Sequence, residues 1–306
     1  MAPSMHNAGR GTAEGRRFAF GQNWSRYLAV VDDARIELSK SSFIEFLGTD
    51  SLDGLSFLDV GSGSGLSSLA AISLGAARVH SFDYDPASVT ATTEIKRRYA
   101  PHADHWSIER GSVLDATYME GLGTFDFVYT WGVLHHTGDM RLAFRHVAER
   151  VAPGGRLWLA IYNDQGHRSE IWRRVKRIYN ELPPFLRPLW VVLTMSPLEV
   201  KTFLYHLVRG RPQRYFTNEL RGRDRSRGMS RWHDFVDWVG GYPFEVARPD
   251  AIVDTFRAFG LSEARLRLVD GYGCNEFLFT KAVLGAHGTP SSTAVTSPSA
   301  DRPVIR

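Results

Sequence analysis

The stretch FLDVGSGSGLSS, residues 57–68, joins an apolar run to three glycines at every second position and then to small residues that can open a helix. Glycine lets a backbone approach a ligand closely, and the first N–H groups of a helix are available to bind it. Such a turn between a buried strand and a helix is usually built to take an adenine-containing cofactor. The stretch therefore predicts an α/β fold with a cofactor site at this turn.

The residues around the glycines distinguish among three candidate cofactors: a nicotinamide dinucleotide, a nucleoside triphosphate and S-adenosylmethionine. A dinucleotide fingerprint, G-x-G-x-x-G, needs a glycine where Leu66 stands, and a triphosphate loop needs a lysine that the stretch lacks. Asp59, two residues before Gly61, indicates a cationic or amino-bearing ligand instead. Asp83, which ends the next predicted strand, can accept hydrogen bonds from both hydroxyls of a ribose. These residues favour the third candidate, S-adenosylmethionine.

Strand and helix signals alternate along the chain. The predicted strands are 55–60, 77–83, 105–111, 125–131, 155–163, 261–269 and 274–281, and the predicted helices are 18–47, 64–74, 86–98, 140–151 and 248–260. Strands that alternate with helices predict right-handed crossovers and a largely parallel sheet. The last two strands are joined by a tight turn at Asp270-Gly271 and must run antiparallel. We expect a Rossmann-like seven-stranded sheet, mostly parallel with an antiparallel last strand, flanked by helices.

Composition divides the chain further. We expect disordered tails at 1–15 and 285–306, N-terminal lid helices at 16–48, a cofactor-binding domain formed by 49–163 and 246–284, and a helical substrate-binding insert at 164–245. The net charge of +4 is unevenly placed. Residues 164–231 carry 15 Lys and Arg against 6 Asp and Glu, which gives +9 there and leaves −5 elsewhere. The basic character therefore belongs to the insert.

Composition also bounds the class of protein. The single cysteine, Cys274, excludes an internal disulfide framework and favours a reducing compartment. No apolar run approaches the ~20 residues that a membrane span needs, and the N-terminal residues lack the apolar segment of a signal peptide. We therefore expect a cytoplasmic protein with no membrane span.

Taken together, the motifs resemble those of class I S-adenosylmethionine-dependent methyltransferases of the small-molecule type. Four segments match the family's first to fourth motifs in order, and a fifth looks like the segment that leads into its fifth strand: LDVGSGSG at 58–65, SFDYD at 81–85, GSVLD at 111–115, FDFVYTWGVLHHT at 125–137 and PGGRLWLAIYN at 153–163. The resemblance covers about residues 50–163 and 246–282. It implies an enzyme that uses S-adenosyl-L-methionine.

The resemblance also implies positions for the residues that bind the cofactor. Asp59 and Gly61 would lie beside the amino and carboxylate groups of its methionine part, with Gly63 beneath the ribose. Asp83 would bind the ribose hydroxyls, and Tyr84 would pack on the adenine or the ribose.

Further cofactor residues come from the neighbouring segments. Ser112 or Val113 would meet the adenine, although many members carry an acidic residue where Ser112 stands; Gly65 and Trp131 complete the predicted cofactor residues. The segment FGQNWSRY at 20–27 resembles the lid helix of small-molecule members. Trp24 or Tyr27, or Arg35 beyond them, would then close over the cofactor. The alternative is an ordinary amphipathic helix packed on the sheet.

Two adjacent histidines follow the fourth predicted strand. His135 and His136 cannot form the i, i+4 pair of a metalloprotease, and with one cysteine in the chain we expect no metal site. In many small-molecule members the second histidine lies near the cofactor sulfonium, so both are candidate bases, with a structural role as the alternative. Thr130-Trp131-Gly132 differs from the Asn-Pro-Pro-Tyr that would suggest methylation of a nucleobase.

The insert supplies candidates for the acceptor site. In WHDFVDWVGGYPFEVA, 232–247, His233 and Asp237 are candidate bases, and Tyr242 and Glu245 are candidate substrate residues. Asn163 ends the fifth predicted strand and would point toward the cofactor methyl. The two arginine clusters at 209–214 and 221–231, with Arg227 as a candidate, could bind a phosphate or carboxylate, or could be solvated surface. Few aromatic residues interleave with them, so a nucleic-acid partner is not favoured.

The reaction follows from the cofactor. Its sulfonium methyl is already activated, so the protein need only align a nucleophile and remove a proton. We expect methyl transfer to an oxygen or nitrogen of a small molecule, a secondary metabolite or a sugar-like acceptor. Three alternatives remain open: use of the cofactor without methylation, such as cyclisation of its aminobutyl chain; an RNA methyltransferase; and a non-catalytic cofactor-binding regulator. The sequence also leaves a homodimer open.

Overall fold

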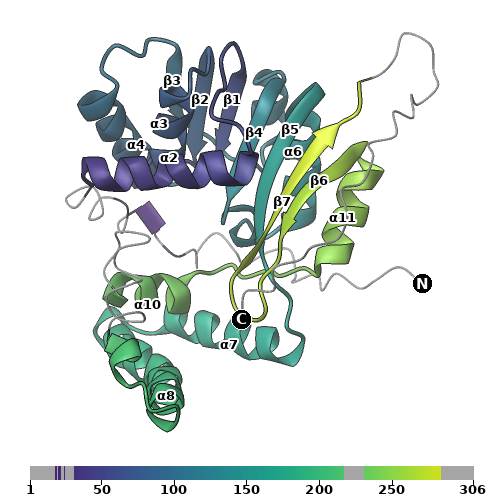
Figure 1. Cartoon of the computed structure of the whole chain (residues 1–306). Coiled ribbons are helices and arrows are strands. Elements are labelled where there is room, and N and C mark those ends of the chain that lie inside the picture. Colours follow the sequence, from purple (N-terminus) through teal and green to yellow (C-terminus); the bar gives the residue numbers. More distant parts are fainter. Residues whose placement is uncertain (1–17, 19, 22–23, 25–30, 217–230, 284–306) are drawn as a thin grey trace.

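A seven-stranded sheet forms the centre of the computed structural model, which describes residues 18, 20–21, 24, 31–216 and 231–283 of the chain (Figure 1). The strands are β1 (Ser56–Val60), β2 (Arg78–Asp83), β3 (Trp106–Arg110), β4 (Phe125–Trp131), β5 (Val151–Tyr162), β6 (Leu261–Arg267) and β7 (Cys274–Lys281), in the spatial order β3-β2-β1-β4-β5-β7-β6. Strands β1 to β5 pair in parallel, and β7 runs antiparallel to both of its neighbours. The predicted fold class is confirmed.

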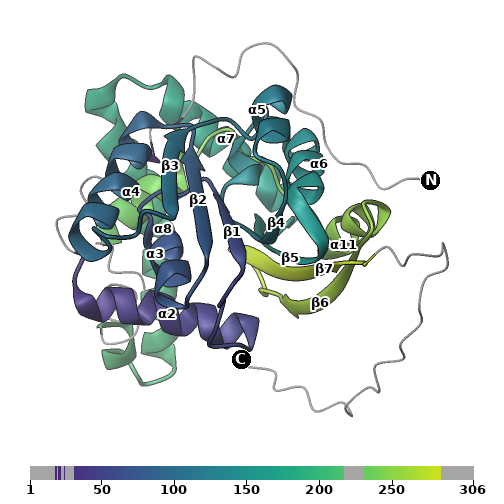
Figure 2. The same cartoon turned by 90° about the horizontal axis from the view of Figure 1, so that it is seen from above.

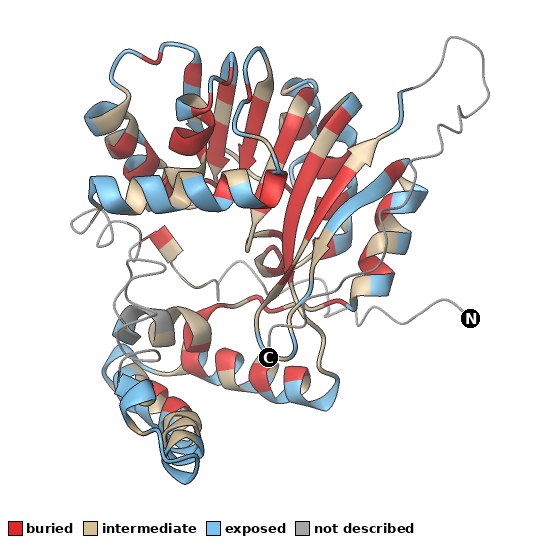
Figure 3. Cartoon of the chain, in the orientation of Figure 1, coloured by how far each residue is buried: buried red, intermediate tan, exposed pale blue. Residues whose placement is uncertain are grey.

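Helices cover both faces of this sheet (Figure 2). They are α2 (Asp33–Leu47), α3 (Leu66–Ser73), α4 (Pro86–Tyr99), α5 (Ala116–Gly121), α6 (Met140–Arg150) and α11 (Pro249–Ala258). On one face, α2, α3 and α4 bury Phe46 and Leu69 in a cluster with Trp158. On the other, α5, α6 and α11 bury Phe144 and Phe256. The central strand β1 is almost entirely buried between these clusters, whereas the edge strands β3 and β6 expose several residues (Figure 3).

The elements differ from the prediction in three places. The helix expected at 18–47 is interrupted: Phe20, Gly21 and Trp24 are helical, and α2 begins at Asp33, where the Asp32 carboxylate accepts a hydrogen bond from the Arg35 backbone N–H and caps it. Helix α5 was not predicted, since six residues are too few to show a helical period. Strand β5 begins at Val151, four residues before the predicted strand, and it includes Pro153 and Gly154.

A further helical layer lies beyond one end of the sheet (Figure 1). It consists of α7 (His167–Glu181), α8 (Arg187–Val208) and α10 (Arg231–Gly240), with short 3₁₀ turns at η2 (Leu134–His136) and η3 (Pro184–Leu186). Its own core contains Trp172, Tyr179, Val191, Met195 and Phe244. Because α7 follows β5, this layer faces the carboxyl ends of the parallel strands. Within the described residues, no helix combines the length and the apolar character that a membrane crossing requires.

Candidate functional site

The glycine turn lies at the carboxyl end of β1 and has a backbone that only glycine adopts without strain. Gly61, Gly63 and Gly65 have φ angles of 79°, 54° and 82°. A Cβ on Gly61 would lie 2.5 Å from the Val133 side chain, and one on Gly65 would lie 2.9 Å from the Thr92 Cα atom. The turn is therefore closely packed at Gly61 and Gly65, and neither position has room for a side chain.

Asp83, at the carboxyl end of β2, is bonded to this turn. Its carboxylate accepts hydrogen bonds from the backbone N–H of Gly63 at 3.0 Å and of Asp85 at 2.9 Å. Burial raises the pKa of Asp83 to about 6, although these two N–H groups favour the ionised form. A carboxylate can accept about four hydrogen bonds. Asp83 therefore has capacity to bind hydroxyl groups at the turn.

Asp59 lies beneath the turn and is buried. The Ser68 hydroxyl donates to it at 2.5 Å, and Ser68 in turn contacts the Ser81 hydroxyl at 2.7 Å. Burial raises the pKa of Asp59 to about 7; the Ser68 hydrogen bond lowers it and the nearby charge of Asp83 raises it. A positively charged ligand group placed beside this carboxylate would offset the cost of its ionisation.

The described residues near the N-terminus cross this edge of the sheet. The Trp24 indole would lie 3.1 Å from a Cβ on Gly63, so it rests on the glycine turn. The Gly21 N–H donates to the Asp85 carboxylate at 2.8 Å, and the Phe20 ring lies 4.9 Å from the His136 ring. Helix α2, in contrast, packs on the sheet. That Trp24 or Arg35 closes over the cofactor stays a prediction, and Tyr27 lies outside the described residues.

The predicted adenine contacts already have partners in the protein. The carbonyl of Val113 accepts a hydrogen bond from the His146 ring at 2.6 Å, and the Ser112 hydroxyl accepts one from the Leu114 N–H at 3.2 Å. Asp115, which follows them, caps α5 by accepting from the Tyr118 N–H.

Two aromatic candidates lie on different parts of the sheet. The Tyr84 side chain is exposed beside the end of β2, with the Arg110 guanidinium 5.6 Å from its ring centroid. Trp131 ends β4 and packs with the cluster under α2 and α3, and its indole hydrogen-bonds to Glu276. Tyr84 thus lies at the surface beside the end of β2, whereas the Trp131 ring packs with the core on the α2 side.

The two adjacent histidines differ in environment. His135 is fully buried, and within the described part of the chain neither of its ring nitrogens has a hydrogen-bond partner. Burial, with the charges of His136 and Lys176, lowers its pKa well below the ordinary value, so the ring is neutral. His136 contacts the Pro243 carbonyl oxygen through Nδ1 at 2.6 Å. Since a carbonyl only accepts, Nδ1 carries the proton, and Nε2 is the basic nitrogen of the neutral ring.

A buried lysine that the sequence analysis missed lies beside these histidines. Lys176, on α7, is fully buried and donates through Nζ to the Trp238 carbonyl. Its ammonium group lies 4.8 Å from the centroids of the Trp238 and Phe244 rings and 5.7 Å from that of Tyr162. Burial lowers the pKa of Lys176 to about 7, although the charge of Asp237 opposes this. The signal was present in the sequence, because Lys176 stands on the buried stripe of α7 with Trp172 and Tyr179.

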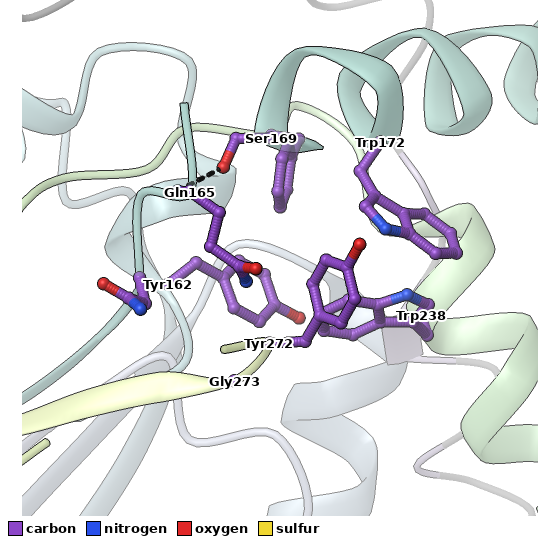
Figure 4. A pocket seen from close by; sticks show the side chains of 9 residues that line it. Tyr162, Gln165, Ser169, Trp172, Trp238, Tyr272 and Gly273 are labelled. Carbon is purple, nitrogen blue, oxygen red and sulfur yellow. Dashed lines mark hydrogen bonds between the residues drawn. The ribbon is translucent and has the colours of Figure 1, made fainter. Parts of the chain in front are cut away.

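A pocket opens next to this lysine, where β5 ends and the helical layer begins (Figure 4). It is lined by Tyr162, Asn163, Gln165, Ser169, Trp172, Trp238, Phe244, Tyr272 and Gly273. Its volume of about 10 Å³ is room for a single water molecule, so a larger ligand requires these side chains to move apart. The rings of Trp172, Trp238 and Tyr272 stand edge to face around it, with centroids 5.4 to 5.9 Å apart. It is an aromatic box with polar groups on one side.

The predicted substrate residues have different positions around this pocket. Asn163 lines it, but its amide donates to the carbonyls of Val269 and Gly271 and so also fixes the turn before β7. Tyr242 packs in the core of the helical layer. The carboxylate of Glu245 accepts from the N–H groups of Gly138 and Met140, and burial raises its pKa to about 7. Glu245 therefore caps α6.

The remaining predicted residues give less information. Asp237 is half-buried on α10, close enough to Lys176 to raise its pKa. Arg227 and the side chain of His233 lie outside the described residues. Among the side chains that the structure describes, no three His, Cys, Asp or Glu residues gather in a way that could hold a metal ion.

Known proteins share both the sequence pattern and the fold. Residues 33–189 match a methyltransferase domain family. Over 117 residues, 38% of the chain, the sequence is 35% identical to the ribosomal protein L11 methyltransferase of Methylococcus capsulatus, and this covers 36% of that protein. Over 119 residues it is 31% identical to a ubiquinone biosynthesis O-methyltransferase of Caulobacter sp. strain K31, covering 38% of the chain and 44% of that protein.

A solved structure extends the likeness of fold. Magnesium protoporphyrin IX methyltransferase from Synechocystis PCC 6803, with bound SAH, superposes with a TM-score of 0.51 at 14% identity, covering 85% of this chain and 94% of that one. The curated relatives are matched over less than half of their own length.

The residues at the carboxyl edge fit S-adenosylmethionine. The glycine turn cannot take side chains, a buried carboxylate stands where a cationic amino group would be stabilised, and a second carboxylate ends the next strand. The family match covers half of the chain and includes all of these residues. The chain therefore belongs to the methyltransferase domain family, and it is a class I S-adenosylmethionine-dependent methyltransferase.

Proposed function

We propose that this enzyme transfers a methyl group to an oxygen or nitrogen of a small molecule that binds in the aromatic pocket at the end of β5. The observation that carries the proposal is the short path between this pocket and the glycine turn. Val133 packs on Gly61, and three residues later the His136 ring lies 5.5 Å from the ring of Tyr162, which lines the pocket. An acceptor in the pocket would thus lie next to the cofactor.

The cofactor residues have proposed roles that their surroundings support. Asp83 would accept hydrogen bonds from the ribose hydroxyls, and Asp59 would offset the positive charge of the amino group. The glycine turn would lie under the ribose, with Tyr84 against the adenine or ribose. When bound, S-adenosylmethionine supplies an activated methyl group, so the chain need only orient the acceptor, exclude water and take up a proton.

His136 is the residue that we propose to take up this proton. Its Nδ1–H is held by the Pro243 carbonyl, which orients the ring and makes Nε2 the basic atom. His135 is less suited, because burial keeps it neutral and lowers its pKa. Asp237 and His233 remain proposals from the sequence. A hydroxyl acceptor would need such a base, whereas an amine would need mainly orientation.

The lining of the pocket supports a flat acceptor. Trp172, Trp238 and Tyr272 offer ring faces and edges, while Gln165 and Ser169 offer polar groups on one side (Figure 4). Aromatic and sugar rings both pack on such side chains, which is consistent with a secondary metabolite or a sugar-like molecule. Matches of 117 and 119 residues leave most of the chain unaligned, so the substrates named for the relatives do not decide the acceptor. The single cysteine supports a cytoplasmic enzyme.

Turnover with identified products tests the proposal. The purified enzyme is incubated with S-adenosylmethionine and a panel of phenols, amines and sugars, and products are identified by mass spectrometry. We expect S-adenosylhomocysteine together with a methylated acceptor. Methylthioadenosine would instead indicate cyclisation of the aminobutyl chain, steeply salt-dependent RNA binding would indicate an RNA methyltransferase, and tight cofactor binding without turnover of any acceptor would indicate a regulator.

Two variants then separate the acceptor site from the cofactor site. Tyr272→Ala opens the pocket at an exposed side chain, so it should raise the KM for the acceptor at least tenfold and leave cofactor affinity unchanged. Tyr205→Ala, an exposed tyrosine on α8, is the matched control. If Tyr272→Ala left the acceptor KM at the value of the control, the pocket would not be the acceptor site.

A further inference from the structure

The outer face of α8 is apolar except at Ser196, which is exposed midway along it. Seven of its residues are each at least 47% exposed: Leu189, Val192, Leu193, Val200, Leu204, Leu207 and Val208. At 100° per residue these positions fall within one arc of the helix, opposite the buried Val191 and Met195. We call these seven residues the α8 stripe. Figure 3 shows exposed positions following this helix at the edge of the molecule.

The apolar outer face of α8 is unusual for a surface helix. A surface helix places its apolar stripe toward the core and charged residues toward water. Helix α8 does bury Val191 and Met195 in the core of the helical layer, but its opposite face carries the α8 stripe in place of charges. Single exposed apolar residues need no explanation, whereas a continuous stripe marks a surface that binds something.

Positive charge gathers at the C-terminal half of the α8 stripe. Residues 182–216 contain five Lys and Arg against a single carboxylate, Glu199. Lys201 is exposed on the helix, and Arg209, Arg211 and Arg214 are exposed just beyond its end. Exposed aromatic rings, Phe185 before the helix and Phe216 after it, extend the apolar surface at both ends.

An anionic lipid surface fits this combination best. It supplies hydrocarbon for an apolar stripe and, a few ångströms away, phosphates for the flanking cations, as amphipathic helices that lie in a membrane interface require. A second copy of this chain on the same face would bring two strongly basic segments together, since residues 164–231 carry +9. We propose that α8 docks this methyltransferase on the surface of a membrane rich in anionic lipid, with the α8 stripe lying in the interface and Arg211 and Arg214 on the phosphates.

Sedimentation with lipid vesicles tests the proposal. The full chain is mixed with vesicles of phosphatidylcholine alone or of phosphatidylcholine with phosphatidylglycerol. We expect sedimentation with the anionic vesicles, much weaker sedimentation with the neutral ones, and a loss of binding as salt is raised. A full chain that stays in the supernatant with anionic vesicles would overturn the proposal, as would equal binding to both kinds of vesicle.

Paired variants separate the apolar and the charged contributions. Leu193→Ser with Val200→Ser should weaken binding at least tenfold. Arg211→Gln with Arg214→Gln should weaken it about thirtyfold, at about fivefold for each charge. The control, Arg97→Gln with Arg257→Gln, removes two exposed charges elsewhere and should bind as the unchanged protein does.

Circular dichroism confirms that each variant is folded, and sizing of the unchanged protein separates lipid binding from self-association. If the serine variant bound anionic vesicles as tightly as the control, the α8 stripe would not be the contact. If the unchanged protein were a dimer that the serine variant converts to a monomer, without any vesicle binding, the stripe would be a subunit interface and the proposal would be wrong.

Discussion

Replacing Lys176 by methionine should change how the stability of the fold depends on pH. In the folded state the Lys176 side chain is buried away from water, and this burial lowers its pKa from 10.5 to about 7. This difference corresponds to at most about 5 kcal/mol of cost for the charged form. The Trp238 and Phe244 rings attract the ammonium group and so stabilise the charged form. The figure of about 5 kcal/mol is therefore an upper bound on the cost of charging Lys176.

The direction of the effect follows from proton counts. Between about pH 7 and about pH 10 the unfolded chain keeps the proton on Lys176 and the folded chain does not, so the free energy of unfolding rises with pH. From about pH 7 to about pH 9 this amounts to about 2 kcal/mol. Lys176→Met has no proton to lose and should lack this rise. It also leaves the Trp238 carbonyl without its donor, at a cost of about 1–3 kcal/mol that does not change with pH.

Urea denaturation followed by circular dichroism at about pH 7 and about pH 9 measures the effect. The free energy of unfolding of Lys176→Met, relative to the unchanged protein, should fall by about 2 kcal/mol between the two conditions. Lys201→Met, which removes an exposed lysine from α8, is the matched control and should show no such fall. A difference that stays constant with pH would refute the assignment of a neutral, desolvated Lys176.

Three further outcomes are expected. Gly65→Ala forces a Cβ against the Thr92 backbone at a φ of 82°, so it should lower the free energy of unfolding by about 2 kcal/mol or more in thermal denaturation. If Asp83 binds the ribose as an ionised group, cofactor affinity by calorimetry should fall about tenfold for each pH unit below about 6, and Asp83→Asn should be weak at every pH. Asp32→Ala removes the cap of α2 and should lower stability by about 1 kcal/mol, whereas the neighbouring Asp33→Ala should change it little.

The sequence predicted the glycine turn and the position of Asp83 because both depend on residues that are close together along the chain. The spacing of the glycines follows from the sharp turn after β1, and Asp83 is placed by the end of the next strand, so both were visible as patterns along the chain. The same kind of argument predicts on which face of the sheet the Trp131 side chain lies. Side chains alternate along a strand, and Trp131 therefore shares the face of Tyr129, which packs under α2.

The aromatic pocket could not be predicted in this way, because it exists only through tertiary contacts. Tyr162 comes from β5, Trp172 from α7, Trp238 from α10 and Tyr272 from the turn before β7. No spacing in the sequence brings these rings together. Lys176 was hidden for a related reason: in a segment dense with arginines it was counted as one more surface charge, although its place on the buried stripe of α7 set it apart.

The N-terminal residues that cross the carboxyl ends of the parallel strands have a consequence for the affinities of the two ligands. The Phe18 N–H donates to the Tyr242 carbonyl at 3.0 Å beside the helical layer, while Trp24, six residues on, rests on Gly63. One short segment thus touches both the cofactor cradle and the surroundings of the pocket. A ligand that displaces Trp24 changes the free energy of the contacts at Tyr242, and the reverse holds equally. We therefore expect the cofactor and acceptor affinities to be coupled, so that each depends on the concentration of the other ligand.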